Sequence, residues 1–495
     1  MKLSSLELSS IELNSHLEQA FANASPRITP RKPSNVSKII HWFILAFTLI
    51  IFSRFFISSG IYAWSTGLAY VFYDTALLVF VTWQTLPLLK KQLKTSHLTP
   101  LKQSPTSVGV IVAAYNEVDV LGITIQALMQ QHYIPDQIII ADDGSDDGTI
   151  QLLMREYGFG EPYLGQISAP SPINPNLYWL RVAHKGKATA LNAAIKQIST
   201  DIVITVDADT LLDINAISAM CDAFEREPQL VAATGVLTPI CNNTWTGRFF
   251  QWFQTYEYIR NFISRFAWMR VNSLLLISGA FAGFRHKALL EVGGFDTACL
   301  VEDYELIHRM RRYAVEHQRD WSVRVLGDAL ARTSAPSTLK GFLLQRRRWF
   351  AGFLQTQYWN RDMTGSPRFG NLGTMMLPVK AIDTVQPFYG VIAFLLLLNF
   401  IGSYYVTGKT SILLAVLLVI MTKIVIDLIF HLWSIYLYQS WTGQHSKSLF
   451  FYAIIAAILE PFSFQLLRHT GALMGWFYFL AGKQKWGKQS RQGFS

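Results

Sequence analysis

Long apolar stretches at both ends of the chain constrain its fold more than any other feature of the sequence. Residues 39–57 and 68–89 precede a central region, and residues 388–406, 411–438 and 449–467 follow it, with a shorter stretch at 471–480. Because ~20 apolar residues cross a bilayer as a helix, each long stretch is a candidate span. The hydrophobic content of 51% agrees with this assignment. We expect about five or six crossings.

Basic residues beside the first two stretches predict the orientation of the chain. They precede the first stretch and follow the second, at Arg27, Arg31, Lys32, Lys38, Lys90, Lys91 and Lys94. Cytoplasmic flanks carry an excess of Lys and Arg, so both ends of this hairpin are expected in the cytoplasm. Flanking charge of this kind also accounts for the net charge of +10, and we expect no nucleic-acid partner. The central region would then be cytoplasmic and the protein would lie in the cell inner (plasma) membrane.

The side on which the C-terminus lies stays open. Three C-terminal crossings would put a basic cluster outside the cell, against the charge rule, whereas a fourth short or interfacial segment would return it to the cytoplasm. That cluster consists of Lys483, Lys485, Lys488 and Arg491.

These patterns divide the chain into four parts. Residues 1–37 are polar without a sustained period and predict a mobile cytoplasmic tail that carries no chemistry, since a cleaved signal peptide would need its apolar run nearer the start. Residues 38–95 form a transmembrane hairpin, 105–360 a cytosolic domain, and 361–495 interfacial and transmembrane helices. The three cysteines, Cys221, Cys241 and Cys299, lack metal-ligand spacing, so reduced thiols are expected, with neither disulfide nor zinc.

The central region alternates apolar strands with helical stretches. Residues 108–114, 137–141 and 202–206 are short, nearly continuous apolar runs, typical of parallel strands that are buried on both faces. The first run is followed by Ala113-Ala114-Tyr115-Asn116-Glu117 in place of a Gly-x-Gly-x-x-Gly turn, which disfavours a dinucleotide-binding Rossmann dehydrogenase. The fold class that we predict is an α/β nucleotide-sugar-binding (GT-A-like) domain inserted between α-helical transmembrane segments.

Pairs of aspartates directly follow two of the predicted strands. Asp207 and Asp209 follow residues 202–206, so they lie at the carboxyl edge of the sheet, where ligands bind in this architecture. Hard oxygen ligands in such a place suit Mg²⁺ or Mn²⁺ shared with substrate phosphates, since such an ion keeps only one or two protein carboxylates. Asp142 and Asp143 follow residues 137–141 in the same way, with a capped loop as the structural alternative.

Two further clusters complete a fixed order along the chain. Glu302-Asp303 could be an acid pair at a helix start, which the helix dipole favours, or a catalytic pair. In Gln345-Arg346-Arg347-Arg348-Trp349, the spacing of Gln345, Arg348 and Trp349 places them on one helical face. Arg346 and Arg347 fit a basic helix resting on anionic headgroups as an alternative.

The ordered set of motifs, from about Ser107 to Gly352, resembles family 2 glycosyltransferases, in particular their membrane-embedded processive branch of cellulose, hyaluronan and poly-N-acetylglucosamine synthases. On the donor side, the resemblance implies that Asp142 holds the uridine and that Tyr115 and Glu117 line the base and ribose pocket. It implies that Lys187 meets the diphosphate and that the remaining acids hold the diphosphate and its metal, namely Asp207 and Asp209. His184 departs from the Asn or Gly common there and is interpreted as structural.

On the acceptor side, the resemblance implies that Asp303, beside Glu302, is the general base that takes the proton of the attacking hydroxyl, with inversion. Val301 departs from the usual Thr of this motif, although not at an acid. The Gln-x-x-Arg-Trp signature implies that Trp349 stacks on the acceptor sugar, that Arg348 reaches phosphate and that Gln345 bonds a sugar hydroxyl.

Two other features leave alternatives open. The aromatic-rich stretch from Trp245 to Trp268 suits either docking beneath the membrane spans or ordinary core packing. Inside the apolar stretch 411–438, Lys423, Asp427 and His431 share one helical face, with Asp74 as a candidate companion. They fit a self-neutralising ion pair or a hydrated polymer path equally well.

We therefore expect an inverting, metal-dependent glycosyltransferase that extends a β-linked polysaccharide and passes it through its own membrane helices. UDP-N-acetylglucosamine is the first expected donor and UDP-glucose the second. A single-transfer enzyme with a lipid acceptor and an inactive binding or export subunit are the rivals. The membrane lipid is an expected partner, and accessory subunits are compatible with this interpretation.

Overall fold

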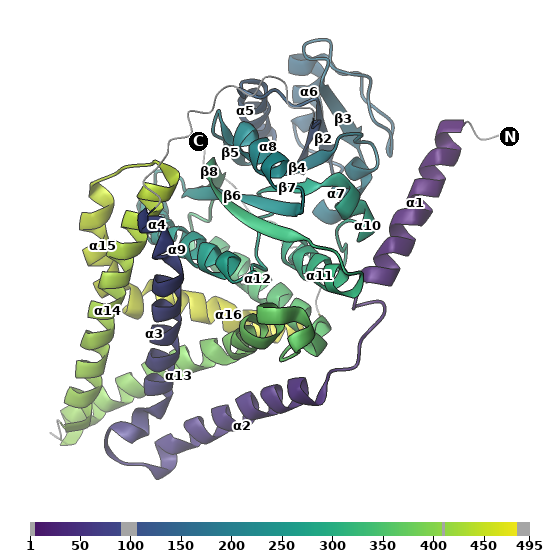
Figure 1. Ribbon diagram of the computed structural model, residues 1–495. Helices are drawn as coiled ribbons and strands as arrows, with labels where there is room; N and C mark the ends of the chain where they lie inside the picture. Colours follow the sequence, from purple (N-terminus) through teal and green to yellow (C-terminus); the bar gives the residue numbers. More distant parts are fainter. Residues whose placement is uncertain (1–4, 91–105, 408–410, 483–495) are drawn as a thin grey trace.

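A computed structural model describes residues 5–90, 106–407 and 411–482 of the chain (Figure 1). The central region contains an eight-stranded mixed sheet in the order β3-β2-β1-β4-β7-β6-β8-β5. Its strands are β1 (Val108–Ala114), β2 (Gln137–Asp142), β3 (Leu177–Arg181), β4 (Ile202–Asp207), β5 (Thr210–Leu212), β6 (Leu230–Ile240), β7 (Phe281–Arg285) and β8 (Ser322–Ser334). The three apolar runs identified in the sequence are β1, β2 and β4, so that expectation is confirmed.

Strands β1, β2, β3 and β4 run parallel and form one half of the sheet. Most of their side chains are buried, as expected for strands covered by helices, and the edge strand β3 keeps Tyr178 and Arg181 partly exposed. In the register of the sheet, Ala113 pairs with Asp207 and Ala114 pairs with Asp142. The acids that end β2 and β4 therefore lie at the same edge, on either side of β1.

Helices cover the sheet on both sides and join it to the long apolar helices (Figure 1). Those of the central region are α5 (Val118–Met129), α6 (Thr149–Tyr157), α7 (Lys187–Ile195), α8 (Ala216–Arg226), α9 (Trp245–Arg270), α10 (His286–Glu291), α11 (Glu302–Glu316) and α12 (Leu339–Trp359). Helix α9 contacts β6 and β8 on one side and the apolar helices α3 (Ser65–Thr85) and α14 (Ser411–Thr442) on the other. The aromatic-rich stretch is this helix, and it serves both as core and as a dock for the spans.

Four helical segments of the described chain are long and apolar enough to cross a membrane: 35–57, 60–89, 372–406 and 412–442. They contain α2 (Asn35–Ile57), α3 with the short α4 (Pro87–Lys90), α13 (Leu377–Thr407) and α14. The many exposed apolar side chains of α2 fit a lipid-facing helix. Short helical turns at Gly60–Trp64, Arg361–Met363, Pro367–Phe369 and Leu372–Met376 connect these elements.

The expected span at 449–467 is not one straight helix. Helix α15 (Ser448–Leu459) and helix α16 (Phe464–Leu480) meet at a 45° bend, and the described residues contain a fifth candidate span only if this pair counts as one. The break coincides with a 3₁₀ turn, Glu460–Phe462, whose Pro461 lacks the N–H that a continuous helix needs. Helix α16 contains both the end of the expected span and the stretch 471–480, so these belong to one helix. This helix runs beside α12.

The N-terminal part differs from the expected mobile tail. Residues Ser5–Ala24 form helix α1, and Leu17 and Ala24 are buried. Composition alone predicted no order here, because the apolar partners of these side chains lie far away in the chain, in the central region. Lys91, Lys94 and the basic cluster from Lys483 to Arg491 lie outside the described residues, so the orientation predicted from them stays a prediction.

Candidate active site

A cavity of about 760 Å³ lies at the carboxyl edge of the sheet and continues towards the apolar helices. It brings together eight of the residues predicted from sequence, which come from four separate motifs: Lys187, Asp207, Asp209, Glu302, Asp303, Gln345, Arg348 and Trp349. Helices α9, α11, α12, α13 and α16 supply most of the remaining wall. Residues far apart in the chain thus face one space.

One end of the cavity carries a buried lysine between acids. Lys187 opens α7, and its Nζ forms an ion pair with Asp207 at the tip of β4 and lies 3.6 Å from Glu302 Oε1. Burial acts to lower the pKa of the Lys187 ammonium, but attraction by Asp207, Glu302 and Asp303 outweighs it and raises the pKa. Burial likewise raises the pKa of the Glu302 carboxyl, although Lys187 opposes this. The lysine therefore stays charged at neutral pH.

Asp207 and Asp209 offer the oxygen ligands that a divalent cation would use. Both line the cavity, and Asp209 is only 4% exposed. Within the described ranges, no group of three or more His, Cys, Asp or Glu residues could hold a metal ion. This donor set fits an ion that takes its remaining ligands from phosphate and water. Such an ion would compete with Lys187 for Asp207.

Asp303 is held firmly at the start of α11. Its Oδ2 accepts a hydrogen bond of 2.7 Å from the Gly279 N–H, and its Oδ1 accepts one of 2.8 Å from the Tyr304 N–H. Each carboxylate oxygen has two lone pairs, so both keep capacity to accept a proton. A Cβ added at Gly279 would lie 3.0 Å from Asp303 Oδ2, which leaves little room for any other residue there. The acid pair begins a helix and also lines the cavity.

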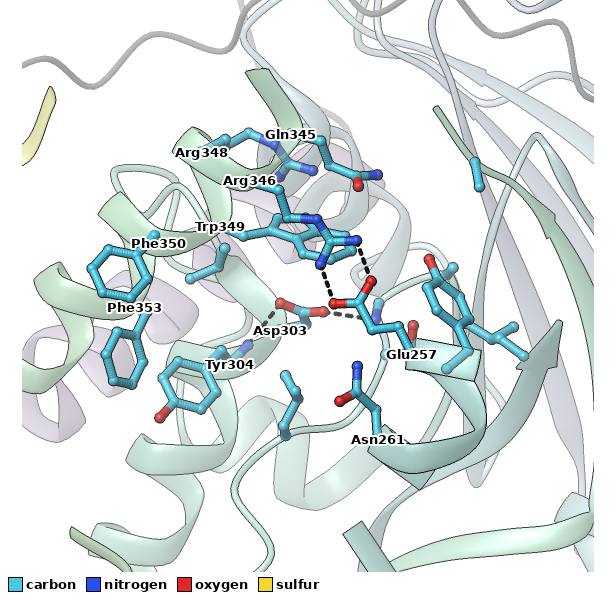
Figure 2. Close-up of a pocket in the computed structure, with 18 of the residues that line it drawn as sticks. Glu257, Asn261, Asp303, Tyr304, Gln345, Arg346, Arg348, Trp349, Phe350 and Phe353 are labelled. Atoms are coloured by element: carbon cyan, nitrogen blue, oxygen red, sulfur yellow. Dashed lines mark hydrogen bonds and ion pairs between the residues drawn. The ribbon is translucent and has the colours of Figure 1, made fainter. Parts of the chain in front are cut away.

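The Gln-x-x-Arg-Trp motif lies on α12, with Gln345, Arg348 and Trp349 on the cavity side as its spacing predicted (Figure 2). Arg348 donates a 3.1 Å hydrogen bond to the Leu300 carbonyl, just before the Glu302-Asp303 pair. The alternative that placed Arg346 on headgroups is wrong, since Arg346 is 8% exposed.

Arg346 instead braces the motif from inside the protein. Its guanidinium donates to both carboxylate oxygens of Glu257 at 2.7 Å (Figure 2). The same guanidinium lies 4.5 Å from the Trp349 ring centroid and 4.6 Å from that of Phe342, within cation–π range. The predicted acceptor platform is therefore backed by a buried ion pair.

Tyr115, Glu117 and Asp142 lie near the ends of β1 and β2, outside the lining of the cavity. Asp142 is fully buried, which raises its pKa, and it accepts a 2.8 Å hydrogen bond from the Ser145 N–H. The Tyr115 ring stacks on His184 at 4.0 Å between centroids. The roles of these three residues in base binding stay predictions.

Residues 105–352 match the family described as "Glycosyltransferase like family 2", which is half of the chain. The chain belongs to this family. It is similar to the poly-beta-1,6-N-acetyl-D-glucosamine synthase of Staphylococcus epidermidis, with 28% identity over 296 residues that cover 59% of this chain and 65% of that protein. The enzyme of the same name from Staphylococcus aureus strain MSSA476 is 30% identical over 247 residues, 49% of this chain and 53% of that protein. The chain thus spans about half to two thirds of the length of these relatives.

The fold agrees with a solved glycosyltransferase structure. A mannosyltransferase from Pyrobaculum calidifontis, in complex with GDP-Man and Mn²⁺, superposes with a TM-score of 0.52 and covers 81% of this chain and 99% of that chain. Its sequence is 19% identical, so the likeness concerns the fold. The mixed sheet of this family 2 glycosyltransferase is GT-A-like, as the sequence predicted.

Sequence reasoning missed three polar residues of the glycosyltransferase that line the cavity from α9. Glu257, Asn261 and Arg265 are spaced by four residues and share one helical face (Figure 2 labels the first two). Burial lowers the pKa of Arg265 to about 10. Their spacing by four residues is visible in the sequence, but it lies within the aromatic-rich stretch, whose many aromatic side chains indicated packing instead.

Asp143 was also missed as a separate contributor. It accepts hydrogen bonds from the N–H groups of Lys185 and Gly186, and its Oδ2 lies 2.8 Å from His184 Nδ1. It thereby shapes the loop that leads into Lys187. The contacts of His184 with Asp143 and with the Tyr115 ring hold this loop together, in keeping with its structural interpretation.

The charged residues of α14 do not line the cavity. Lys423 forms ion pairs with Asp427 and, at 2.7 Å, with Asp74 of α3, so the expected companion is confirmed. His431 lies 3.5 Å from Glu460 at the bend between α15 and α16. In the part of the chain that the structure describes, these contacts favour the ion-pair alternative over a polymer path.

Proposed function

We propose that this family 2 glycosyltransferase moves a sugar from a UDP-sugar to a growing β-linked polysaccharide, with inversion, and exports the product. The observation that supports this most is the extent of the cavity. It continues from Lys187 and Asp207 past Trp349 to Lys380 and Asp383 on α13 and to His469 on α16. A product formed at the acids would thus meet a polar opening towards the apolar helices.

Different parts of the cavity have residues suited to each of the two substrates. Lys187 is a compact point charge for a diphosphate, and Arg348 adds a second cation near the leaving group. Mg²⁺ or Mn²⁺ held by Asp207 and Asp209 would supply Lewis-acid stabilisation of the departing UDP. The likeness to a mannosyltransferase solved with GDP-Man and Mn²⁺ supports a nucleotide-sugar and metal of this kind.

The acceptor would enter from the α12 side. Trp349 offers a flat apolar face for a sugar ring, with Gln345 beside it. The acceptor hydroxyl attacks the anomeric carbon from the face opposite UDP while Asp303 accepts its proton. The electron pair of the broken bond leaves with UDP, and the new glycosidic bond has inverted configuration.

The donor order, UDP-N-acetylglucosamine before UDP-glucose, rests on the similarity to poly-beta-1,6-N-acetyl-D-glucosamine synthases. The basic flanks of the first hairpin support catalysis on the cytosolic face of the inner membrane. Membrane lipid surrounds the spans in this proposal, and accessory subunits are compatible with it.

The test is incubation of purified protein in lipid with labelled UDP-sugars, Mg²⁺ or Mn²⁺, followed by sizing of the product. A polymer made from one donor supports the proposal. A single sugar attached to lipid would instead identify a single-transfer enzyme. Failure to hydrolyse or transfer any UDP-sugar would indicate a binding or export subunit.

A further inference from the structure

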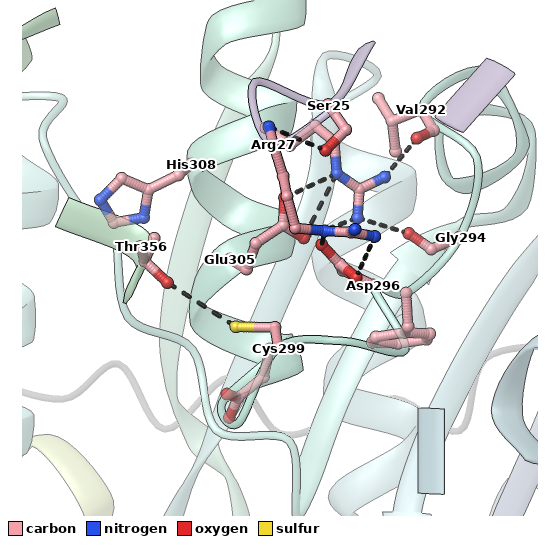
Figure 3. A network of polar contacts seen from close by, with 12 residues as sticks. Ser25, Arg27, Val292, Gly294, Asp296, Cys299, Glu305, His308 and Thr356 are labelled. Carbon is pink, nitrogen blue, oxygen red and sulfur yellow. Dashed lines mark hydrogen bonds and ion pairs between the residues drawn. The ribbon is translucent and has the colours of Figure 1, made fainter. Parts of the chain in front are cut away.

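The segment after α1 packs against the loop that leads to the catalytic acids. Arg27 binds Asp296 through two hydrogen bonds, 2.8 Å from Nε and 2.9 Å from Nη2 (Figure 3). The Asp296 side chain is fully buried and that of Arg27 is 27% exposed. This is a bidentate, largely desolvated pair between residues 269 positions apart, which is the strong kind of charge-assisted contact.

Asp296 organises the loop from Gly293 to Leu300. Its Oδ1 also accepts a 2.8 Å hydrogen bond from the Ala298 N–H. At the other end of the loop, the Leu300 carbonyl accepts the bond from Arg348 described above. The loop is therefore held at Asp296 by Arg27 and at Leu300 by the Gln-x-x-Arg-Trp helix, two residues before Glu302.

Phe21 of α1 packs against the same loop. Its ring lies 4.7 Å from the guanidinium of Arg309, which donates 2.7 Å to the Gly294 carbonyl and pairs with Glu305 of α11. Gly293 has φ of 81°, and a Cβ there would lie 2.2 Å from the Phe21 nitrogen. The backbones of α1 and the loop thus touch without room for a side chain.

We propose that Arg27 is a positioning residue for the reaction, and that residues 17–27 clamp the loop that sets the places of Glu302 and Asp303. The clamp lies outside residues 105–352, the part that matches the family. Its catalytic consequence rests on the proposed function. The competing possibility is that the contact contributes only to overall stability.

The test compares Arg27→Gln with a matched control, Arg31→Gln, in the full-length protein in lipid. Arg31 makes a neighbouring but looser pair, 3.5 Å from Glu316 with 47% of its side chain exposed. A small misplacement of catalytic groups lowers turnover, so Arg27→Gln should reduce kcat for transfer on the order of 10- to 100-fold. UDP affinity should stay at the wild-type value, and the control should match wild type in both measurements.

Cys299 gives a second readout that needs no turnover. It lies in the clamped loop, is 4% exposed, and burial raises the pKa of its thiol well above the usual value, so it should react slowly. In Arg27→Gln, N-ethylmaleimide should modify Cys299 faster than in wild type or Arg31→Gln, with the site located by peptide mass spectrometry.

The two readouts separate the clamp from the proposed function. If wild-type protein transfers no sugar, the proposed function fails, while Cys299 labelling still tests the clamp. Unchanged labelling in Arg27→Gln would overturn the clamp. So would wild-type kcat, or a loss of UDP affinity in step with turnover, since the latter indicates a general loss of structure.

Discussion

Removing the charge of Glu257 should disable the proposed acceptor side of the cavity while donor binding survives. Glu257 is 2% exposed and holds Arg346 by two bonds of 2.7 Å, and Arg346 in turn lies against Trp349. In Glu257→Gln, the buried guanidinium loses its counter-charge. We expect it to move towards water and to leave the indole without its support.

The magnitude follows from the burial of the pair. The side chains of Arg346 and Glu257 are 10% and 3% exposed, so water screens the interaction little. Breaking such a pair by removing one partner costs on the order of 3–5 kcal/mol. Arg468, 3.2 Å from Glu257, adds less to this cost because it is 33% exposed and lies 3.8 Å from Glu460.

The assay is thermal unfolding in detergent together with UDP affinity and product length per folded molecule. Glu257→Gln should unfold at a lower temperature than wild type and make a shorter product, while its UDP affinity stays at the wild-type value. The double variant Glu257→Gln with Arg346→Met should be less destabilised than Glu257→Gln, because no unpaired charge stays buried. Arg347→Met is the control, because it removes the next positive charge of α12 at a residue whose guanidinium lies over the Tyr478 ring. Wild-type stability and product length in Glu257→Gln would refute the reasoning.

Three further predictions concern the residues proposed to contact substrate. Asp303→Asn should keep UDP-sugar binding but lower transfer on the order of 10²–10⁴-fold, and a near wild-type rate would remove Asp303 from the role of base. Asp207→Asn and Asp209→Asn should each weaken Mn²⁺-dependent UDP binding, measured by titration with and without Mn²⁺, and unchanged metal dependence in both would make these acids structural. Trp349→Ala should shorten or stop polymer growth with near-normal UDP affinity; wild-type product lengths made at the wild-type rate would contradict the stacking role.

The parts of the site that sequence can predict are those written in local patterns. Buried parallel strands appear as short apolar runs, and their ends meet at one edge, so the sequence alone places Asp142 and Asp207 at that edge, as the strand register confirms. The helical spacing of Gln345, Arg348 and Trp349 likewise predicts a shared face, which the cavity lining confirms.

Contacts between distant segments could not be predicted in this way. Glu257 and Arg346 are 89 positions apart, and neither belongs to a spacing that identifies the other. The same holds for Arg27 and Asp296, whose pairing gives order to a segment with the composition of a tail. The cost of breaking such pairs depends on the burial that the two residues share, which a one-dimensional pattern does not record.

The charged cluster on α14, a candidate membrane span, contains a contact that decides which variants can test its role. The sequence suggests replacing Lys423 and Asp427 together, which would remove a self-contained pair. Because Lys423 also binds Asp74 at 2.7 Å, that double variant leaves a carboxylate without its cation inside the helix bundle. If the cluster only stabilises helix packing, Lys423→Met with Asp427→Leu should fold less well, and adding Asp74→Leu should restore folding and polymer yield. The measurement is polymer yield per folded molecule in reconstituted vesicles. A triple variant that folds and binds UDP but exports no polymer would instead assign these charges to the product path.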